Sequence, residues 1–212
     1  MSVINDVLEA LRFGGAMVWP LLVLAVIALA IMLDKLFVYR TRTRLPRPLI
    51  DQIETYGFRW EDVETRIKGL GPRNYAGEFL HVIVSNRSHP AWWVESRAAD
   101  EASQIEKSLG RWLWILDTVV TAAPLLGLLG TIMGMVGAFK LFGASGLVDP
   151  AGVTGGVAEA LIATALGICV ALVALAGYNF FSDRQAKLMD EMERLGTRLI
   201  DRIRLDAGEK RS

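Results

Sequence analysis

Residues 118–139 read TVVTAAPLLGLLGTIMGMVGAF, a stretch without one charged side chain. A membrane core of ~30 Å is crossed by about 20 apolar residues in a helix, so this stretch is long enough to span it. Its glycines Gly127, Gly130, Gly134 and Gly137 recur at a spacing of 3-4-3 and therefore share one helix face. The stretch predicts a transmembrane helix that lets another helix approach closely.

Two other stretches have the same character. Ala16–Leu33 is uncharged, and from Pro150 to Ser182 the only charged side chain is Glu159. Buried helices of a soluble protein are the alternative, but those are usually shorter and carry a polar face. We therefore predict an all-α integral membrane protein. Its three transmembrane helices are expected at residues 16–39, 118–140 and 153–182.

The basic residues near the span ends predict the orientation, because cytoplasmic loops are enriched in Lys and Arg. They follow span 1, precede span 2 and follow span 3: Arg40, Arg42, Arg44, Arg47, Lys107, Arg111, Arg184 and Lys187. Between spans 2 and 3, residues 141–158 hold no Lys or Arg; Lys140, at the end of span 2, is the exception. We expect residues 1–15 and 141–152 to lie outside the cell membrane, and 40–117 and 183–212 to be cytoplasmic.

The segments outside the membrane read as helical. Gly and Pro divide the first part into short helices expected at 48–56, 60–68 and 74–87, and one long helix is expected over about 91–142. Apolar residues recur every three or four positions before span 2 and after span 3, so both spans should extend into the cytoplasm as long helices. These stripes are Val94, Ala98, Ala102, Ile105, Leu109, Trp112 and Leu116, and Leu188, Met192, Leu195, Leu199 and Ile203. They can pack within one chain or between chains, and we expect both.

Span 3 also carries a small-residue face at a spacing of 4-3-4-4-3. Its members are Gly156, Ala160, Ala163, Gly167, Ala171 and Ala174. Together with the glycines of span 2, this face exceeds what one three-helix protomer needs, and it predicts a homo-oligomer. Tight packing of spans 2 and 3 within one subunit is the alternative.

Glu159 is the candidate functional residue, because an ionisable group inside the bilayer is costly and usually marks an ion path or a partner contact. At 1.5 Å per residue, it lies at about the same depth as Thr131, and Thr164 lies nearer the middle. A carboxyl can exchange protons and hydroxyls can bind water, so the three residues are the predicted proton pathway. The alternatives are a neutral Glu159 that holds helices together and threonines that bond to their own preceding turn. One carboxyl alone is too little to pass protons across the membrane, so a partner is expected to supply another titratable group.

Other functions find little support. The single cysteine, Cys169, and the two histidines, His81 and His89, form no metal-ligand spacing, and no nucleophile set or phosphate loop is present. Lys+Arg and Asp+Glu both number 23, which points to no nucleic-acid partner. We therefore predict neither an enzyme nor a cofactor or metal site.

Two blocks resemble a known family. Residues 123–134, APLLGLLGTIMG, look like the second-span signature of the MotA/TolQ/ExbB proton-channel family, and residues 156–167, GVAEALIATALG, look like its third-span signature. Tyr178-Asn179 fits the pair that often closes that span. Three spans and a short chain are more like ExbB or TolQ than like MotA-type flagellar stators. The Asp149-Pro150 loop and the Gly-Met-Val at residues 134–136 are more like ExbB, and a TolQ-type subunit of the Tol-Pal envelope system is the alternative. A non-conducting membrane scaffold is a further alternative.

The resemblance implies an expected assembly and mechanism. It implies a pentamer around a pair of single-span helices from an ExbD-like partner, whose span carries an essential aspartate. Proton flow would drive motion that a TonB-like protein transmits to outer-membrane transporters. The carboxylate matching Glu159 and the hydroxyls matching Thr131 and Thr164 would line the inner cavity. Membrane lipid is the other expected partner. The resemblance also implies a bacterial inner membrane, in which the outer segments 1–15 and 141–152 are periplasmic.

Overall fold

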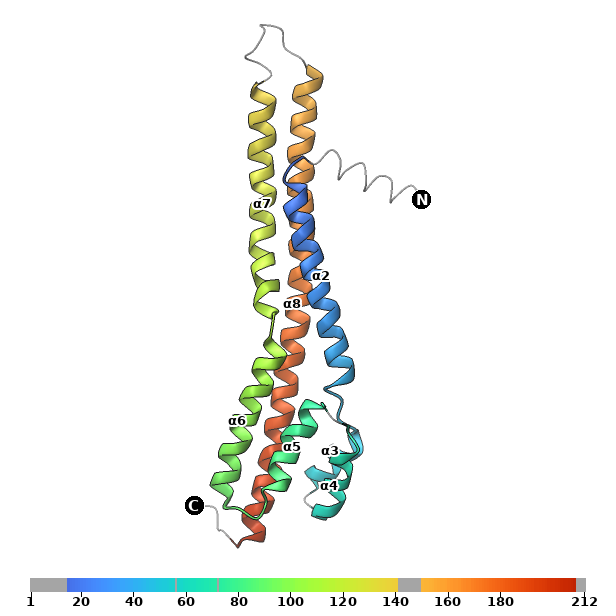
Figure 1. Cartoon of the computed structure of the whole chain (residues 1–212), viewed down its shortest axis with the longest axis vertical. Helices are drawn as coiled ribbons and strands as arrows, with labels where there is room; N and C mark the ends of the chain where they lie inside the picture. The colour runs from blue at the N-terminus through green and yellow to red at the C-terminus, as the bar shows by residue number, and fades with distance from the viewer. Residues whose placement is uncertain (1–14, 56, 72, 141–149, 209–212) are drawn as a thin grey trace. The chain divides into compact units, whose positions relative to one another are not determined.

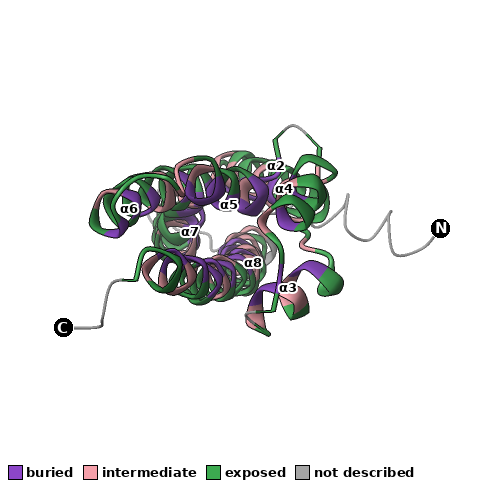
Figure 2. Cartoon of the chain, turned by 90° about the horizontal axis from the view of Figure 1, so that it is seen from below, coloured by how far each residue is buried: buried purple, intermediate pink, exposed green. Residues whose placement is uncertain are grey.

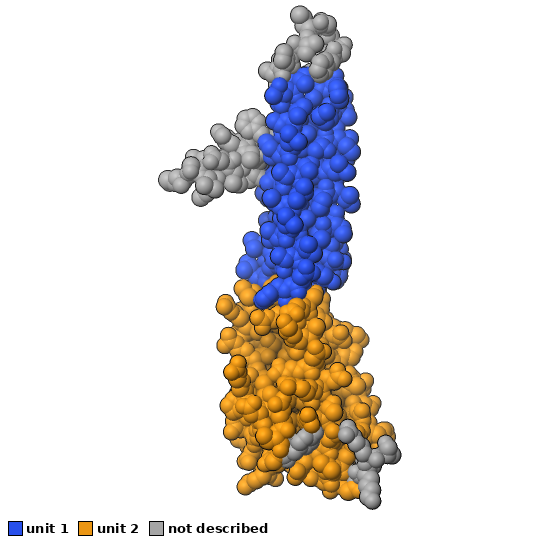
Figure 3. All heavy atoms as spheres, turned by 180° about the vertical axis from the view of Figure 1, so that it is seen from behind, with its two compact units in different colours: residues 1–33, 112–180 blue, residues 34–111, 181–212 orange. Residues whose placement is uncertain are grey.

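The computed structural model describes residues 15–55, 57–71, 73–140 and 150–208. The expected periplasmic segments 1–15 and 141–152 fall almost entirely outside them. The chain forms two compact units, one of residues 1–33 and 112–180 and one of residues 34–111 and 181–212 (Figure 3). Three helices are long and apolar enough to cross a membrane, which confirms the predicted all-helical class with three spans.

The first unit contains most of α2 (Val18–Thr41), all of α7 (Leu113–Lys140) and the first part of α8 (Pro150–Asp206) (Figure 1). Many of its buried positions hold alanine, among them Ala28, Ala123, Ala160 and Ala163. Large apolar side chains on all three helices point outward, where a water-soluble protein would place polar groups. These exposed residues include Leu22, Val26, Leu125, Ile132, Leu161 and Leu172. Such a surface suits contact with lipid or with other membrane helices.

The second unit is a helical bundle with a large apolar core. It contains the last part of α2, from Asp34 on, and the last part of α8. Its other helices are α3 (Arg47–Glu54), α4 (Trp60–Lys68), α5 (Tyr75–Ser85) and α6 (Ala91–Gly110). The short helices lie within two residues of their predicted bounds. Asn74 caps α5, where its side chain accepts a hydrogen bond from the Gly77 N–H at 3.0 Å.

Both predicted cytoplasmic stripes enter the core of the second unit. Leu188, Met192, Leu195, Leu199 and Ile203 are buried there together with most of the α6 stripe, which confirms packing within one chain. Figure 2 shows the buried faces of α5, α6 and α8 in purple, with exposed faces on the opposite sides of these helices. Trp112, which is 40% exposed, and Leu116 belong to the first unit and are not part of this core.

The expected single helix over 91–142 is interrupted. α6 ends at Gly110 and α7 begins at Leu113, with Trp112 between them in the left-handed region at φ +70°. The apolar periodicity continues through Arg111 and Trp112, so periodicity alone missed the break.

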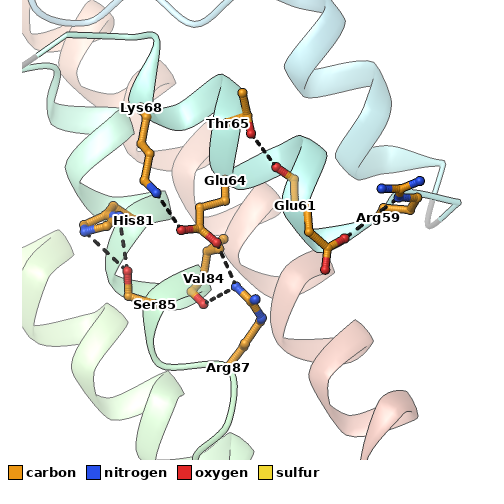
Figure 4. Close-up of polar contacts among 9 residues, drawn as sticks. All are labelled: Arg59, Glu61, Glu64, Thr65, Lys68, His81, Val84, Ser85 and Arg87. Atoms are coloured by element: carbon orange, nitrogen blue, oxygen red, sulfur yellow. Dashed lines mark hydrogen bonds and ion pairs between the residues drawn. The ribbon is translucent and has the colours of Figure 1, made fainter.

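Surface ion pairs connect α4 to the segment that follows α5. Glu64 accepts hydrogen bonds from Lys68 at 2.8 Å and from Arg87 at 3.3 Å (Figure 4). The hydrogen bond from Lys68, followed by that from Arg87, lowers the pKa of Glu64. Pairs this exposed add little to stability, so the apolar core is the main support of this unit.

We expect Leu195→Ala to lower the free energy of unfolding by about 2–5 kcal/mol, because it empties a fully buried position of the core. Leu205→Ala is the matched control on the same helix, since Leu205 is 65% exposed and its removal leaves no cavity. Thermal unfolding of the purified chain in detergent, followed by circular dichroism, measures both. Equal stability of the two variants would contradict the core described here.

Candidate functional site: a glutamate beside the α7–α8 helix pair

The small-residue faces of α7 and α8 meet within one chain. A Cβ added at Gly127 would lie 3.0 Å from the carbonyl oxygen of Ala163, and one at Gly134 would lie 2.9 Å from that of Gly156. From the other helix, a Cβ at Gly167 would lie 2.6 Å from the carbonyl oxygen of Ala123. Separations this short leave room for a hydrogen atom only, so the two backbones are in direct contact along this face.

Six of the seven predicted packing residues lie in this interface: Gly127, Gly130, Gly134, Gly156, Ala163 and Gly167. Gly137 differs, because a Cβ there would meet nothing within 4 Å. Within a single chain, the α7–α8 pair thus uses nearly all of the small-residue surface from which we inferred an oligomer. The packing within one subunit that we considered as the alternative is present.

Glu159 lines a cavity of about 310 Å³ next to this interface. The other described residues around the cavity are small or apolar: Ala16, Met17, Gly130, Met133, Gly134, Gly137, Ala138, Gly152 and Gly156. Glu159 is half-buried, one residue before the buried Ala160 that contacts Gly134. The carboxylate is therefore placed at an edge of the α7–α8 interface, in a hollow that holds no other charged side chain among the described residues.

Gly15, just before α2, lies against the carboxylate. It has φ +67°, and a Cβ at this position would overlap Oε1 of Glu159. The turn it starts is closed by a hydrogen bond from the Val18 N–H to the Gly15 carbonyl at 3.3 Å. Our sequence reasoning missed Gly15 and Met17 as site residues. The glycine pair before span 1 was the only signal, and periodicity carries no information about a turn.

Neither Thr131 nor Thr164 is among the described residues that line this cavity. The Thr131 hydroxyl donates to the carbonyl of Leu128 at 2.6 Å, within its own helix. The Thr164 hydroxyl donates across the interface to the carbonyl of Gly127 at 3.0 Å. Each hydroxyl donor is therefore engaged with backbone, while its oxygen keeps lone pairs that can accept a hydrogen bond.

The helix geometry explains the separation. Thr164 follows Glu159 by five residues, which places them about 140° apart around α8 at 100° per residue. On α7, Gly130 and Gly137 face the Glu159 cavity. Thr131 lies on the opposite side of the line through Gly127 and Gly134, where α7 touches α8. Equal depth in the span, which we derived from sequence, therefore does not bring Glu159 and Thr131 together in one chain.

The described residues contain no group of three or more His, Cys, Asp or Glu side chains close enough to hold a metal ion. The cavity offers one carboxyl in a glycine-lined hollow, and the two hydroxyls lie outside it. Such a set can bind water and exchange protons.

Comparison with known proteins identifies the class. Residues 73–194, which include both motif blocks and Glu159, match the MotA/TolQ/ExbB proton channel family. The chain is 31% identical to the putative biopolymer transport protein ExbB-like 3 of Synechocystis sp., over 84% of this chain and 87% of the relative. It is 42% identical to the biopolymer transport protein ExbB of Aquifex aeolicus, over 42% of this chain and 60% of the relative. It is 32% identical to the Helicobacter pylori protein of the same description, over 50% of this chain and 81% of the relative.

These matches cover the part of the chain that carries the site. The family and the relatives are proton channels and transport proteins, which confirms the prediction that the chain is not an enzyme. Together with the three spanning helices, they define a multi-pass membrane protein. The chain belongs to the MotA/TolQ/ExbB proton channel family.

Proposed function

We propose that this chain is the channel-forming subunit of an inner-membrane complex that uses the proton motive force to power import across the outer membrane. Its proposed partners are an ExbD-like single-span protein and a TonB-like protein. The observation that carries the proposal is the position of Glu159, a carboxyl in a hollow of about 310 Å³ that is lined otherwise by glycine and apolar side chains.

The chemistry of this hollow suits proton exchange. A carboxyl at an otherwise apolar surface has few competing partners, and the hollow is large enough to hold water beside it. A water that bridges Glu159 to a titratable group on another polypeptide would complete a relay that one carboxyl cannot form. We place that second group on the ExbD-like partner, as its essential aspartate.

The positions of the threonines favour a conduit built from several chains. Thr131 and Thr164 lie on the other side of the α7–α8 pair from the Glu159 cavity, so one protomer does not offer all three groups to one channel. A ring of protomers around the partner helices brings faces of different chains to a shared interior. We propose a homopentamer in which the threonine oxygens accept hydrogen bonds from water.

The orientation and the driving force fit this assignment. We propose a periplasmic N-terminus and a cytoplasmic C-terminus, as the Lys and Arg distribution predicts, so Glu159 lies toward the periplasmic side. A proton crossing 100 mV releases ~2.3 kcal/mol, and several protons together supply enough free energy for a mechanical step.

We expect Glu159→Ala and Glu159→Gln to abolish energy-dependent uptake through a TonB-dependent transporter while the complex still assembles, because both remove the proton-exchanging carboxyl. Glu101→Gln is the matched control, since Glu101 is a half-buried acid of α6 in the other unit. Uptake of a labelled substrate by cells that carry each variant is the measurement. Full uptake in both Glu159 variants would exclude the proposed role.

A non-conducting scaffold is the second candidate. The contact between Glu159 and Gly15 favours it, because a carboxyl packed against the turn before α2 can have a purely structural role, which is to hold α2 against α8. In that case Glu159→Gln would release the partner, and the complex would be lost on purification. Recovery of an intact but inactive complex supports the channel, whereas loss of the complex supports the scaffold.

A further inference from the structure

The break between α6 and α7 is not required by the local sequence. Trp112 has φ +70°, a region that residues with a Cβ avoid because of a clash with the carbonyl oxygen. Gly110 weakens the helix at this point but is itself helical, as the last residue of α6. Neither Arg111 nor Trp112 is glycine or proline, and no proline follows before Pro124 inside α7. Contacts that other helices make with the end of α6 offer a further cause.

The decisive contact is made by Lys35. Its Nζ donates to the carbonyl of Leu109 at 2.6 Å, and its side chain is buried, with 2% of the residue exposed. In an uninterrupted α-helix, the Leu109 carbonyl would accept from the N–H of Leu113, four residues later. Lys35 thus supplies the hydrogen bond to Leu109 that the break removes.

A second side chain binds the same turn. Gln185 of α8 donates through Nε2 to the carbonyl of Glu106 at 3.3 Å. Its Nε2 also lies 3.4 Å from where a Cβ of Gly110 would stand, so a side chain at that position would touch it. The last turn of α6 is therefore held from two sides, by Lys35 of α2 and by Gln185 of α8.

We propose that Lys35 is a positioning residue that keeps α6 and α7 as two separate helices. Its ammonium group stabilises the carbonyl end of α6, where the helix dipole favours a positive charge. A buried ammonium group needs an acceptor, and a Leu109 carbonyl that no longer accepts from the Leu113 N–H has both lone pairs available to it. The charge of Lys35 thus selects the broken form, and α7, which carries Thr131 and the glycine face, starts as a new helix at Leu113.

The backbone of Trp112 can be observed directly in the full chain reconstituted in lipid bilayers. Labelling with carbonyl-¹³C arginine and with ¹³C,¹⁵N tryptophan selects Arg-Trp pairs, of which the sequence has two, Arg59-Trp60 and Arg111-Trp112. Trp60 begins α4 and provides an internal helical reference. We expect the Trp112 Cα signal of the unmodified chain in the left-handed range, and its shift into the right-handed helical range in Lys35→Met.

Lys107→Met is the matched control, because Lys107 is an exposed lysine in the same last part of α6. It should leave the Trp112 signal in place, as should Lys35→Arg, which keeps a charged donor. A folded Lys35→Met chain with the Trp112 signal still left-handed would overturn the proposal. If Lys35→Met does not fold, the proposal is tested on the unmodified chain by magnetisation transfer between Lys35 ¹⁵Nζ and the Leu109 carbonyl carbon. Absence of this transfer would also overturn the proposal. The readout is backbone conformation, so either result leaves the proton-path proposal standing.

Discussion

Gly167→Ala is expected to destabilise the membrane unit by about 1–3 kcal/mol, although alanine is the better helix former. The new Cβ would lie 2.6 Å from the Ala123 carbonyl oxygen and 3.1 Å from the Gly127 Cα. Both are backbone atoms of α7, so the clash is relieved only by moving the helices apart, and that separates the whole face. The intrinsic gain of alanine over glycine, at most about 1 kcal/mol, does not offset this loss. Thermal unfolding in detergent, followed by tryptophan fluorescence, measures the effect.

Gly155→Ala is the control for this prediction. It makes the same substitution in the same helix, but a Cβ there would meet nothing within 4 Å. We expect unchanged or slightly higher stability. If the two variants unfold alike, the α7–α8 backbones do not contact each other as described.

Gly15→Ala is expected to reduce energy-dependent uptake about as strongly as the loss of the Glu159 carboxyl, for two physical reasons. The new methyl group would occupy the position of Oε1 of Glu159 and displace the carboxylate from its hollow. In addition, φ +67° costs a residue with a Cβ about 1–2 kcal/mol. Uptake by cells producing the variant at normal levels tests the expectation.

Two comparisons separate these reasons. Gly71→Ala imposes the strain alone, because Gly71 has φ +82° and open space around it, so this variant should lose some stability but retain uptake. In thermal unfolding, the loss of stability on combining Gly15→Ala with Glu159→Ala should be smaller than the sum of the two single losses, since no carboxylate remains to be displaced. Additive losses would mean that Gly15 acts independently of Glu159.

The helices and their faces were largely predictable because they depend on local, periodic patterns. The three spans follow from length and apolarity, and the stripe from Leu188 to Ile203 follows from spacing alone. The small residues from Gly127 to Gly167 were identified as a packing surface by size and spacing. Their partner was not, because a small face fits a helix of the same chain as well as one of a neighbour.

The sequence by itself determined the class of this protein: an apolar chain with three spans, one carboxyl in the third, and two glycine-rich signatures. The tertiary structure decided which groups meet, because contacts between distant residues depend on helix rotation and turns, which periodicity does not encode. It placed Glu159 with Gly15 and apart from both threonines, since five residues along α8 turn Thr164 to another face and Thr131 lies beyond the glycine face of α7. It also placed the Lys35 ammonium at the carbonyl end of α6, where a hydrogen bond from another helix accompanies a break that the local sequence does not require.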